Sequence, residues 1–410
     1  MHTRGNGQLV VAIDVGTTKI CVIVAELIEQ TIAVLGVGKT ISDGLEKGVV
    51  VDIPRTVNSI KKALQEAELM ADVAIQEVYV GISGSHINSF NSHGAVAIKR
   101  GRVTSQDITN VMDAARAVLL GEGYQILHAL AQYFTVDARE RVHDPQGMHG
   151  TRLEVQAHII VGAVAAVQNL VKCCELAGVR VKDVVLEQIA SAQAVLSHDE
   201  QQLGCGIIDI GGGTSDFALY KDGNIRHSLV LPVAGNHVTR DVAIGLRTTL
   251  QDAERVKKEY GRATLYMLSE DMPLEVASMH GGRSHIVLVS ELVAIIEPRM
   301  HELLSLIHKN VVTNKLMPYM RGGLVITGGG SLLPDIDALA ATIFGVSTRI
   351  GYPQSNYQVP ASLQNPVYAT GYGLLVHALK QQSDPFMIAQ SATWTQRLTN
   401  RMRSWISDFF

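Results

Sequence analysis

Charged and aromatic side chains are scarce in this chain of 410 residues, at 18% and 5% of the total. The formal net charge of −4 includes no basic excess, which argues against a nucleic-acid-binding protein because such proteins carry basic surfaces. No apolar run reaches the ~20 residues that a membrane-spanning helix needs. The four cysteines include no Cys-x-x-Cys pair, so neither a zinc site nor a disulfide framework is expected.

Glycine, by contrast, is plentiful, and several of the glycines follow directly after short apolar runs. The run Cys205–Ile210 predicts a buried strand, and Asp209 lies at its end. The residues that follow are Gly211, Gly212, Gly213 and Thr214. Glycines behind a strand let backbone N–H groups approach a phosphate, and threonine adds a hydroxyl donor. A carboxylate here would repel a bare phosphate, so we expect a hydrated Mg²⁺ between them. An ordinary glycine-rich turn is the alternative for this segment alone.

The same pattern stands near the N-terminus, where Asp14 ends a predicted strand over residues 9–15. The residues behind it are Gly16, Thr17, Thr18 and Lys19. The two aspartates are about half the chain apart, which predicts two related lobes that each contribute a phosphate-binding hairpin to a shared cleft. A third cluster follows the apolar run 324–327 and comprises Gly328, Gly329, Gly330 and Ser331.

Residues 84–162 differ in character from the segments on either side. His86–Arg100 predicts paired strands, and Thr104 opens a capping box that predicts a helix to Leu120. Two further strands are predicted at 125–136 and 152–161, the second alternating between an apolar and a polar face. We therefore expect a small α+β subdomain inserted in the first lobe, with one face of its sheet packed and the other facing solvent.

Residues 394–410 hold both tryptophans of the chain and predict an amphipathic helix. Its apolar stripe is Trp394, Leu398, Met402, Trp405, Ile406, Phe409 and Phe410. Three arginines against one aspartate leave the segment basic, which suits a helix lying in the interface of a membrane with anionic lipids. A helix docked on its own protein is the alternative. The polar residues 381–393 before it predict a linker.

The two Asp-Gly-Thr hairpins and the late Gly-Gly-Gly-Ser resemble the nucleotide-binding fold shared by actin, the seventy-kilodalton chaperones and the sugar kinases. Over essentially the whole chain, the inserted subdomain and the amphipathic tail included, the sequence is similar to the FtsA family of bacterial cell-division proteins. The resemblance implies an α/β, two-lobed actin-like ATPase fold with an inserted small α+β subdomain and a C-terminal amphipathic helix. It also implies ATP and Mg²⁺ as cofactors, with at most slow ATPase activity.

The resemblance divides the chain into units. The first lobe would comprise residues 1–83 and 163–202, with helix 369–380 packed back on it, and the insertion 84–162 would serve self-association. The second lobe would have a core of 203–235 and 322–368. Its smaller subdomain, 236–321, would hold the adenine side and the binding site for the C-terminal tail of FtsZ. The linker 381–393 and the membrane-targeting helix 394–410 would follow.

The resemblance also implies roles for single residues. Glu187, with Gln188 as second choice, would orient the attacking water, although the helix dipole favours a carboxylate there without any nucleotide. Glu254 and Lys257, three apart on one helix, would bind the ribose and the adenine edge, with a surface ion pair as the alternative. Arg299 would meet the FtsZ tail. Asp14 and Asp209 would hold Mg²⁺ through water. The predicted ATP-binding residues are Asp14, Gly16, Thr17, Thr18, Lys19, Asp209, Gly211, Gly212, Gly213, Thr214, Gly235, Asn236, Glu254, Lys257, Gly328, Gly329, Gly330 and Ser331.

The function implied is that of a protein that anchors FtsZ filaments to the membrane, polymerises and helps recruit later division proteins to the septal ring. The expected partners are the FtsZ tail, further copies of the chain, anionic lipids and later division proteins. The expected location is peripheral, on the cytoplasmic face of the inner membrane at the septum. Two alternatives stay open: a pilus-assembly adaptor of the same superfamily, which would lack the membrane tail, and a small-molecule kinase on this fold.

Overall fold

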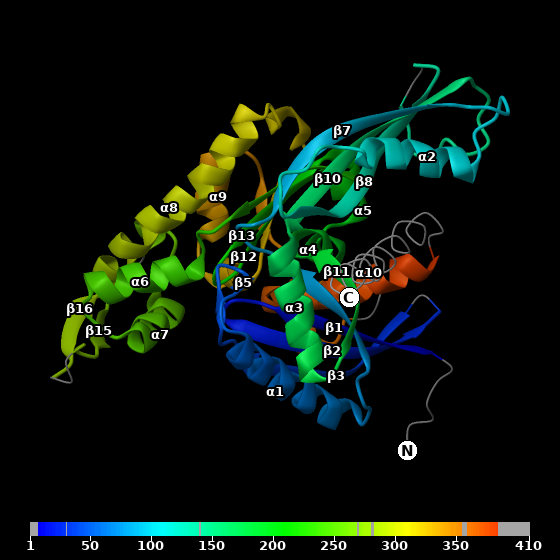
Figure 1. Cartoon of the computed structure of the whole chain (residues 1–410). Helices are drawn as coiled ribbons and strands as arrows, with labels where there is room; N and C mark the ends of the chain where they lie inside the picture. Colours follow the sequence, from blue (N-terminus) through cyan, green and yellow to red (C-terminus); the bar gives the residue numbers. More distant parts are fainter. Residues whose placement is uncertain are drawn as a thin grey trace.

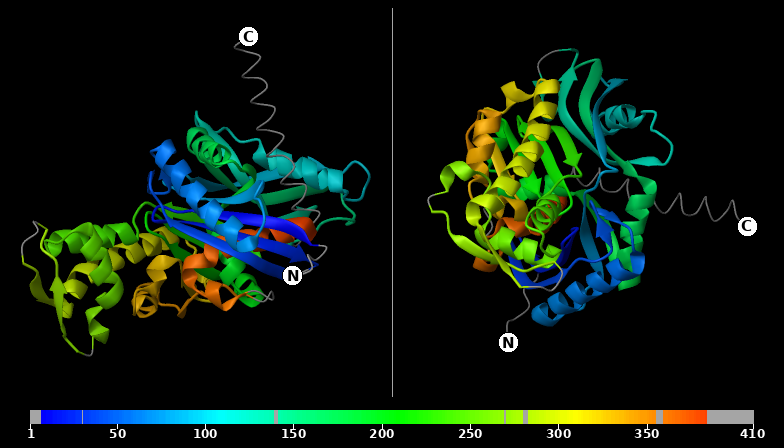
Figure 2. Two further views of the ribbon diagram at one scale, coloured as in Figure 1. Left: turned by 90° about the horizontal axis from the view of Figure 1, so that it is seen from below. Right: turned by 90° about the vertical axis from the view of Figure 1, so that its left-hand side faces the viewer.

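The structure is a computed structural model that describes residues 7–383 except 30, 139–140, 269, 280–282 and 355–358. The described chain forms two lobes, each built on a five-stranded sheet, and a third unit inserted in the first lobe (Figure 1). In Figure 1 and in the right-hand view of Figure 2, this insertion and the first helix lie at opposite ends of the first lobe. Two lobes and an insertion agree with the sequence-based prediction.

The first-lobe sheet has the strand order β11-β6-β1-β2-β3. Its strands are β1 (Gln8–Val15), β2 (Lys19–Ile28), β3 (Thr31–Ile41), β6 (Glu77–Ile82) and β11 (Arg180–Leu186). A small hairpin, β4 (Leu45–Glu46) and β5 (Val49–Val50), precedes the first helix. The helices of this lobe are α1 (Ile53–Ala71), α3 (Val164–Ala177), α4 (Glu187–Val195), α5 (His198–Leu203) and α10 (Ala369–Ser383). Helix α1 packs on β2 and β3, whereas α10 packs on β1 and β6.

The second-lobe sheet repeats this design in the order β14-β13-β12-β17-β18. Its strands are β12 (Cys205–Ile210), β13 (Ser215–Lys221), β14 (Asn224–Leu231), β17 (Leu324–Thr327) and β18 (Thr348–Ile350). In both sheets the first three strands are antiparallel neighbours, and the next two are added in parallel beside the first strand. The matching strand order shows that the repeated sequence pattern reflects two lobes of one design.

Helices and one further hairpin complete the second lobe. The helices are α6 (Gly235–Gly245), α7 (Leu250–Tyr260), α8 (Val289–Thr313) and α9 (Ile336–Phe344), and the hairpin is β15 (Pro273–Val276) with β16 (His285–Leu288). Short 3₁₀ turns are η1 (Leu265–Met267), η2 (Met317–Tyr319), η3 (Gly329–Leu332), η4 (Ala361–Leu363) and η5 (Pro366–Tyr368). The β15–β16 hairpin and α7 form the end of the molecule farthest from the insertion in Figure 1.

The insertion is a four-stranded sheet of order β7-β10-β8-β9 covered by one helix. Its elements are β7 (Asn88–Ala97), α2 (Ser105–Arg116), β8 (Tyr124–Val136), β9 (Arg141–Val142) and β10 (Arg152–Ala163). Thr104 caps α2 through the predicted capping box, but the helix ends at Arg116 rather than at Leu120. The prediction of paired strands over His86–Arg100 is wrong, because this segment forms the single strand β7 and pairs with β10.

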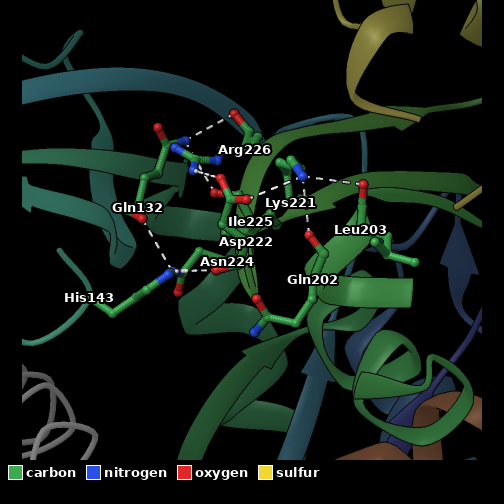
Figure 3. Close-up of polar contacts among 9 residues, drawn as sticks. All are labelled: Gln132, His143, Gln202, Leu203, Lys221, Asp222, Asn224, Ile225 and Arg226. Carbon is green, nitrogen blue, oxygen red and sulfur yellow. Dashed lines mark hydrogen bonds and ion pairs between the residues drawn. The ribbon is translucent and has the colours of Figure 1, made fainter. Parts of the chain in front are cut away.

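The sequence predicted that the polar face of the insertion sheet faces solvent, and this holds only in part: Arg152 is exposed, but another part of the face packs against the second lobe. Gln132 on β8 and His158 on β10 are buried, because this face packs against β14 of the second lobe. The Gln132 amide donates to the carbonyl oxygens of Ile225 and Arg226 at 3.1 and 3.0 Å (Figure 3). His158 pairs with the Ser228 hydroxyl at 2.9 Å, and burial lowers the pKa of His158 to about 3. The insertion therefore connects the two lobes.

Helix α10 continues to Ser383, three residues into the predicted linker. The rest of that linker and the predicted amphipathic helix, with its apolar stripe from Trp394 to Phe410, lie outside the described residues. In the ranges that are described, no helix combines the length and the apolar character needed to cross a bilayer.

Candidate functional site

Two turns of the same construction lie at the ends of β1 and β12. In the first, the Gly16 amide donates to the Lys19 carbonyl at 3.0 Å; in the second, the Gly211 amide donates to the Thr214 carbonyl at 2.9 Å. Asp14 stands two residues before its glycine, and Asp209 stands two residues before the other. The repeated motif in the sequence thus corresponds to one repeated backbone turn.

The two turns face each other across the boundary between the lobes. A Cβ atom added to Gly212 would overlap the side chain of Thr18, and one added to Gly213 would overlap the side chain of Thr17. Only glycine permits this approach of the second turn to the threonines of the first. The structure therefore brings together the two segments that the sequence predicted to share a cleft.

Asp209 is held by hydroxyl groups from two helices of the first lobe. Ser191 on α4 and Thr370 on α10 donate to its Oδ2 at 2.5 and 3.1 Å. Gly328 has a φ of +80° and packs so closely that a Cβ atom would overlap the other carboxylate oxygen. These contacts fix the carboxylate with only 6% of the residue exposed, at the point where the lobes meet.

Asp216 is a second buried carboxylate of the same hairpin, directly opposite Asp209 on β13. Ser83, at the end of β6 in the first lobe, donates to its Oδ1 at 2.6 Å. The Ser83 hydroxyl also lies 3.3 Å from the hydroxyl of Thr214. Burial, together with the charge of Asp209, raises the pKa of Asp216 to about 7, and the hydrogen bonds from Ser83 and Thr214 limit that rise.

Glu187 begins α4 and lies in the field of three other carboxylates. Burial raises its pKa well above 4.5, and the charges of Asp14, Asp216 and Asp209 raise it further. Burial also raises the pKa of Asp209, aided by Asp14. The site thus gathers four acidic side chains whose negative charges oppose one another.

Lys19 is the one cation that pairs with this cluster in the described part of the chain. Its Nζ lies 3.3 Å from Asp14 Oδ2 and donates to the Val367 carbonyl at 2.6 Å. Burial alone would lower the pKa of Lys19, but the Asp14 carboxylate outweighs burial and raises it. One lysine against four carboxylates leaves an excess of negative charge.

A bound divalent cation fits this donor set, because it would balance the buried carboxylates. Among the described residues, however, no three acidic, histidine or cysteine side chains are close enough to ligate one ion directly. An ion here would therefore be held largely through water or through oxygens of a bound anion, which is the manner typical of Mg²⁺.

In the third glycine cluster, at η3, some residues are packed against the protein, whereas one borders open space. Gly330 packs against Ile210, and the Ser331 hydroxyl donates to the Gly328 carbonyl at 2.7 Å. A Cβ atom on Gly329, by contrast, would meet nothing within 4 Å. Of these four predicted residues, Gly329 is thus the one whose backbone faces open space.

The beginning of α6 lies against the second turn. The amides of Gly235 and Asn236 donate to the carbonyls of Gly211 and Gly212 at 3.1 and 2.8 Å. Lys257 on α7 reaches the Gly235 carbonyl at 3.3 Å and the Glu254 carboxylate at 2.5 Å. The Glu254–Lys257 pair is therefore part of the packing around the turn rather than a free surface ion pair.

Arg299 lies away from this cluster, on α8. It pairs with Asp241 on α6 at 2.6 Å and with Glu302 on its own helix. Its charge is therefore partnered within the second lobe.

Sequence reasoning did not assign four residues of the site: Ser83, Ser191, Asp216 and Thr370. Asp216 lies two residues after Thr214 in the second hairpin, and Ser191 lies one helical turn after Glu187, so both could have been found from the sequence. Ser83 and Thr370 follow no motif, and only the three-dimensional arrangement brings them to the carboxylates.

Comparison with protein families gives two matches. A model described as "Cell division protein FtsA" matches residues 206–373, and a model described as "SHS2 domain inserted in FTSA" matches residues 84–161. The chain is 40% identical to the cell division protein FtsA of Pseudomonas aeruginosa, over 96% of this chain and 94% of that protein. It is 33% identical to that of Escherichia coli, over 97% and 98%.

Solved structures of lower identity share the fold. A PilM–PilN type IV pilus biogenesis complex matches with a TM-score of 0.65 at 16% identity, covering 90% of this chain and 98% of that one. MreB5 of Spiroplasma citri bound to ADP matches with a TM-score of 0.56 at 18% identity, covering 92% and 99%. At such identities the likeness shows the fold alone, and it confirms the predicted actin-like architecture.

Proposed function

Because this chain belongs to the FtsA family of cell division proteins, we propose that it binds ATP with Mg²⁺ between its two lobes and links FtsZ filaments to the membrane. The observation that supports the nucleotide site is the meeting of two glycine turns of the same hydrogen-bond pattern beside the buried carboxylates Asp14, Asp209 and Asp216, with Glu187 and Lys19 close by. MreB5 of Spiroplasma citri, which shares this fold, has been solved bound to ADP, and this supports the proposal.

In this proposal the two turns bind phosphates and the carboxylates balance the metal. Thr17, Thr18 and Thr214 offer hydroxyl groups, and Lys19 offers a positive charge. Asp14 and Asp209 hold the hydrated Mg²⁺, whose charge neutralises the phosphates when it is bound. Gly329 presents open backbone on the second-lobe side, and Glu254 with Lys257 closes the adenine side.

The state of Glu187 makes any hydrolysis depend on the bound metal. Burial and the neighbouring carboxylates raise the pKa of Glu187, which favours its protonated form, and a protonated carboxyl group cannot accept a proton from water. Binding of a cation would favour the ionised form, so the residue would act only in the loaded site. The buried side chain of Gln188 stays the second candidate for orienting water.

Asp209→Asn tests the nucleotide site, because asparagine keeps an acceptor for Ser191 and Thr370 but removes the charge. We expect the variant to lose Mg-ATP affinity by roughly tenfold or more in equilibrium binding. Asp113→Asn, on the exposed side of α2, is the matched control and should bind like the wild type. Equal affinity of Asp209→Asn and wild type would reject the site.

The remaining parts of the proposal concern assembly. The chain would polymerise, take part with its insertion in recruiting later division proteins, and lie peripherally on the cytoplasmic face of the inner membrane at the septum through residues 394–410. Arg299 would meet the acidic FtsZ tail, exchanging its pairs with Asp241 and Glu302 for groups of that tail. Membership of the cell-division family favours this reading over a pilus adaptor or a small-molecule kinase.

A further inference from the structure

The turn of the hairpin β4–β5 holds a lysine directly before a glycine that contacts the first phosphate turn. The strands pair Leu45 with Val50 and Glu46 with Val49, so that Lys47 and Gly48 form a two-residue turn. Both have positive φ, +48° and +76°, as a tight hairpin turn of this type requires. Lys47 is exposed at the tip.

The tip is fixed to the first phosphate turn. The Gly48 amide donates to the Thr17 hydroxyl at 3.0 Å. On its other side Gly48 packs against Ser83 and Gly84, where an added Cβ atom would come within 2.9 to 3.0 Å of backbone atoms. Ser83 in turn binds Asp216. The turn therefore rests on Thr17 and Ser83, two of the first-lobe residues that contact the second hairpin.

The charge of Lys47 also affects a residue of the second lobe, His237. The pKa of His237, in the first turn of α6, is lowered by burial, by Arg299 and then by the charge of Lys47. The exposed Arg240 adds to the same field. Lys47 therefore lies near enough to the N-terminal turn of α6 for its charge to act on His237, although Asp241 offsets part of the positive charge there.

The other lysines of the site already have partners, whereas Lys47 has not. Lys19 pairs with Asp14, and Lys257 pairs with Glu254. No ion pair of Lys47 is found among the described residues. Lys47 is exposed and adjoins the glycine that contacts Thr17, so its side chain is available to an anion bound between the turns.

We propose that Lys47 binds the terminal phosphate of the nucleotide and so distinguishes ATP from ADP. This inference rests on the proposed nucleotide function. Thr17, which the tip contacts through Gly48, belongs to the turn proposed to bind phosphates, whereas Glu254 and Lys257 are the residues proposed to contact the ribose and adenine. Lys47 is thus a specificity-determining residue that neither the motifs nor the family resemblance had singled out.

Lys47→Ala tests the proposal with the full chain, with Mg-ATP and Mg-ADP as probes. We expect about a tenfold loss of Mg-ATP affinity, the effect of a lost charge-assisted hydrogen bond, and Mg-ADP affinity within about twofold of the wild type. Lys47→Arg should restore most of the preference for ATP. Lys62→Ala, an exposed lysine on α1, is the matched control and should change neither affinity.

The ratio of the two affinities separates a ligand contact from a structural effect. A merely misfolded or loosened hairpin would weaken ATP and ADP alike, and that result would overturn the proposal. An unchanged ratio in Lys47→Ala would overturn it as well. If the wild type bound neither nucleotide, the proposed function itself would fail, which is a different outcome from wild-type binding without an effect of Lys47.

Discussion

The ionisation of Asp216 should make the stability of the protein depend on pH. Its pKa rises from the ordinary 3.8 to about 7 on folding, chiefly through burial. Between these values the folded protein keeps a proton that the unfolded chain has released, so raising the pH removes stability. We expect the free energy of unfolding without nucleotide or metal to fall by a few kcal/mol between pH 4 and 7. Urea unfolding at a series of pH values measures this slope.

Asp216→Asn provides the comparison, because the amide oxygen still accepts from Ser83 but cannot ionise. Its stability should depend less on pH over the same range, although Glu187 leaves part of the slope in place. A slope in the variant equal to that of the wild type would show that Asp216 does not titrate in this window.

Single residues were predictable from the sequence to different degrees. Asp14 and Asp209 were found because each ends an apolar run and precedes glycine, which is a local and repeated signal. Ser191 could have been found from its helical spacing to Glu187. Ser83 and Thr370 could not, since a serine or threonine becomes a site residue only through contacts made far along the chain.

At the scale of elements, the turn at η3 offers a matched pair of glycine substitutions. Gly328→Ala would force a side chain into a backbone with φ +80° and against Asp209 and Ile210. We expect it to lower the free energy of unfolding by about 2–4 kcal/mol. Gly329→Ala, whose Cβ atom meets nothing within 4 Å, should cost less than about 1 kcal/mol. Chemical denaturation of both variants measures the difference, and equal losses would contradict this account of the turn.

The elements themselves were largely predictable, and the exceptions have a physical cause. Strand β12 begins and ends where its apolar run does, because it is buried on all sides. The alternation over residues 86–100 predicted two strands paired with each other, whereas the segment forms one strand whose partner, β10, lies much later in the chain. Local sequence carries the period of a strand, whereas pairing depends on the tertiary fold.

At the scale of the whole molecule, the repeated motif correctly predicted two lobes, but the sequence did not predict that the insertion joins them. The contact uses ordinary polar residues, Gln132, His158 and Asn224 among them, whose pattern is that of a solvent-facing strand. Asn224 donates to the Gln132 carbonyl at 3.2 Å and lies 3.1 Å from His143 (Figure 3). A buried polar interface of this kind is recognisable only when both partners are in place.

The expected membrane anchor is the amphipathic segment 394–410, which lies outside the described part of the chain. Each of its large apolar side chains contributes up to ~3 kcal/mol if fully buried in the interface, whereas each arginine near anionic lipid contributes ~1 kcal/mol. Deleting 394–410 should therefore abolish sedimentation with anionic vesicles. Trp405→Ala should weaken it more than Arg403→Ala does.

Assembly should strengthen this binding, because linked copies raise the effective concentration of the tail at the surface. We expect the wild type to sediment more completely with vesicles when Mg-ATP and FtsZ are both present, and Asp209→Asn to lose the part of that gain that depends on nucleotide. The deletion variant should still bind Mg-ATP, which separates loss of the tail from loss of the fold. Unchanged sedimentation of the deletion variant would place membrane attachment elsewhere in the chain.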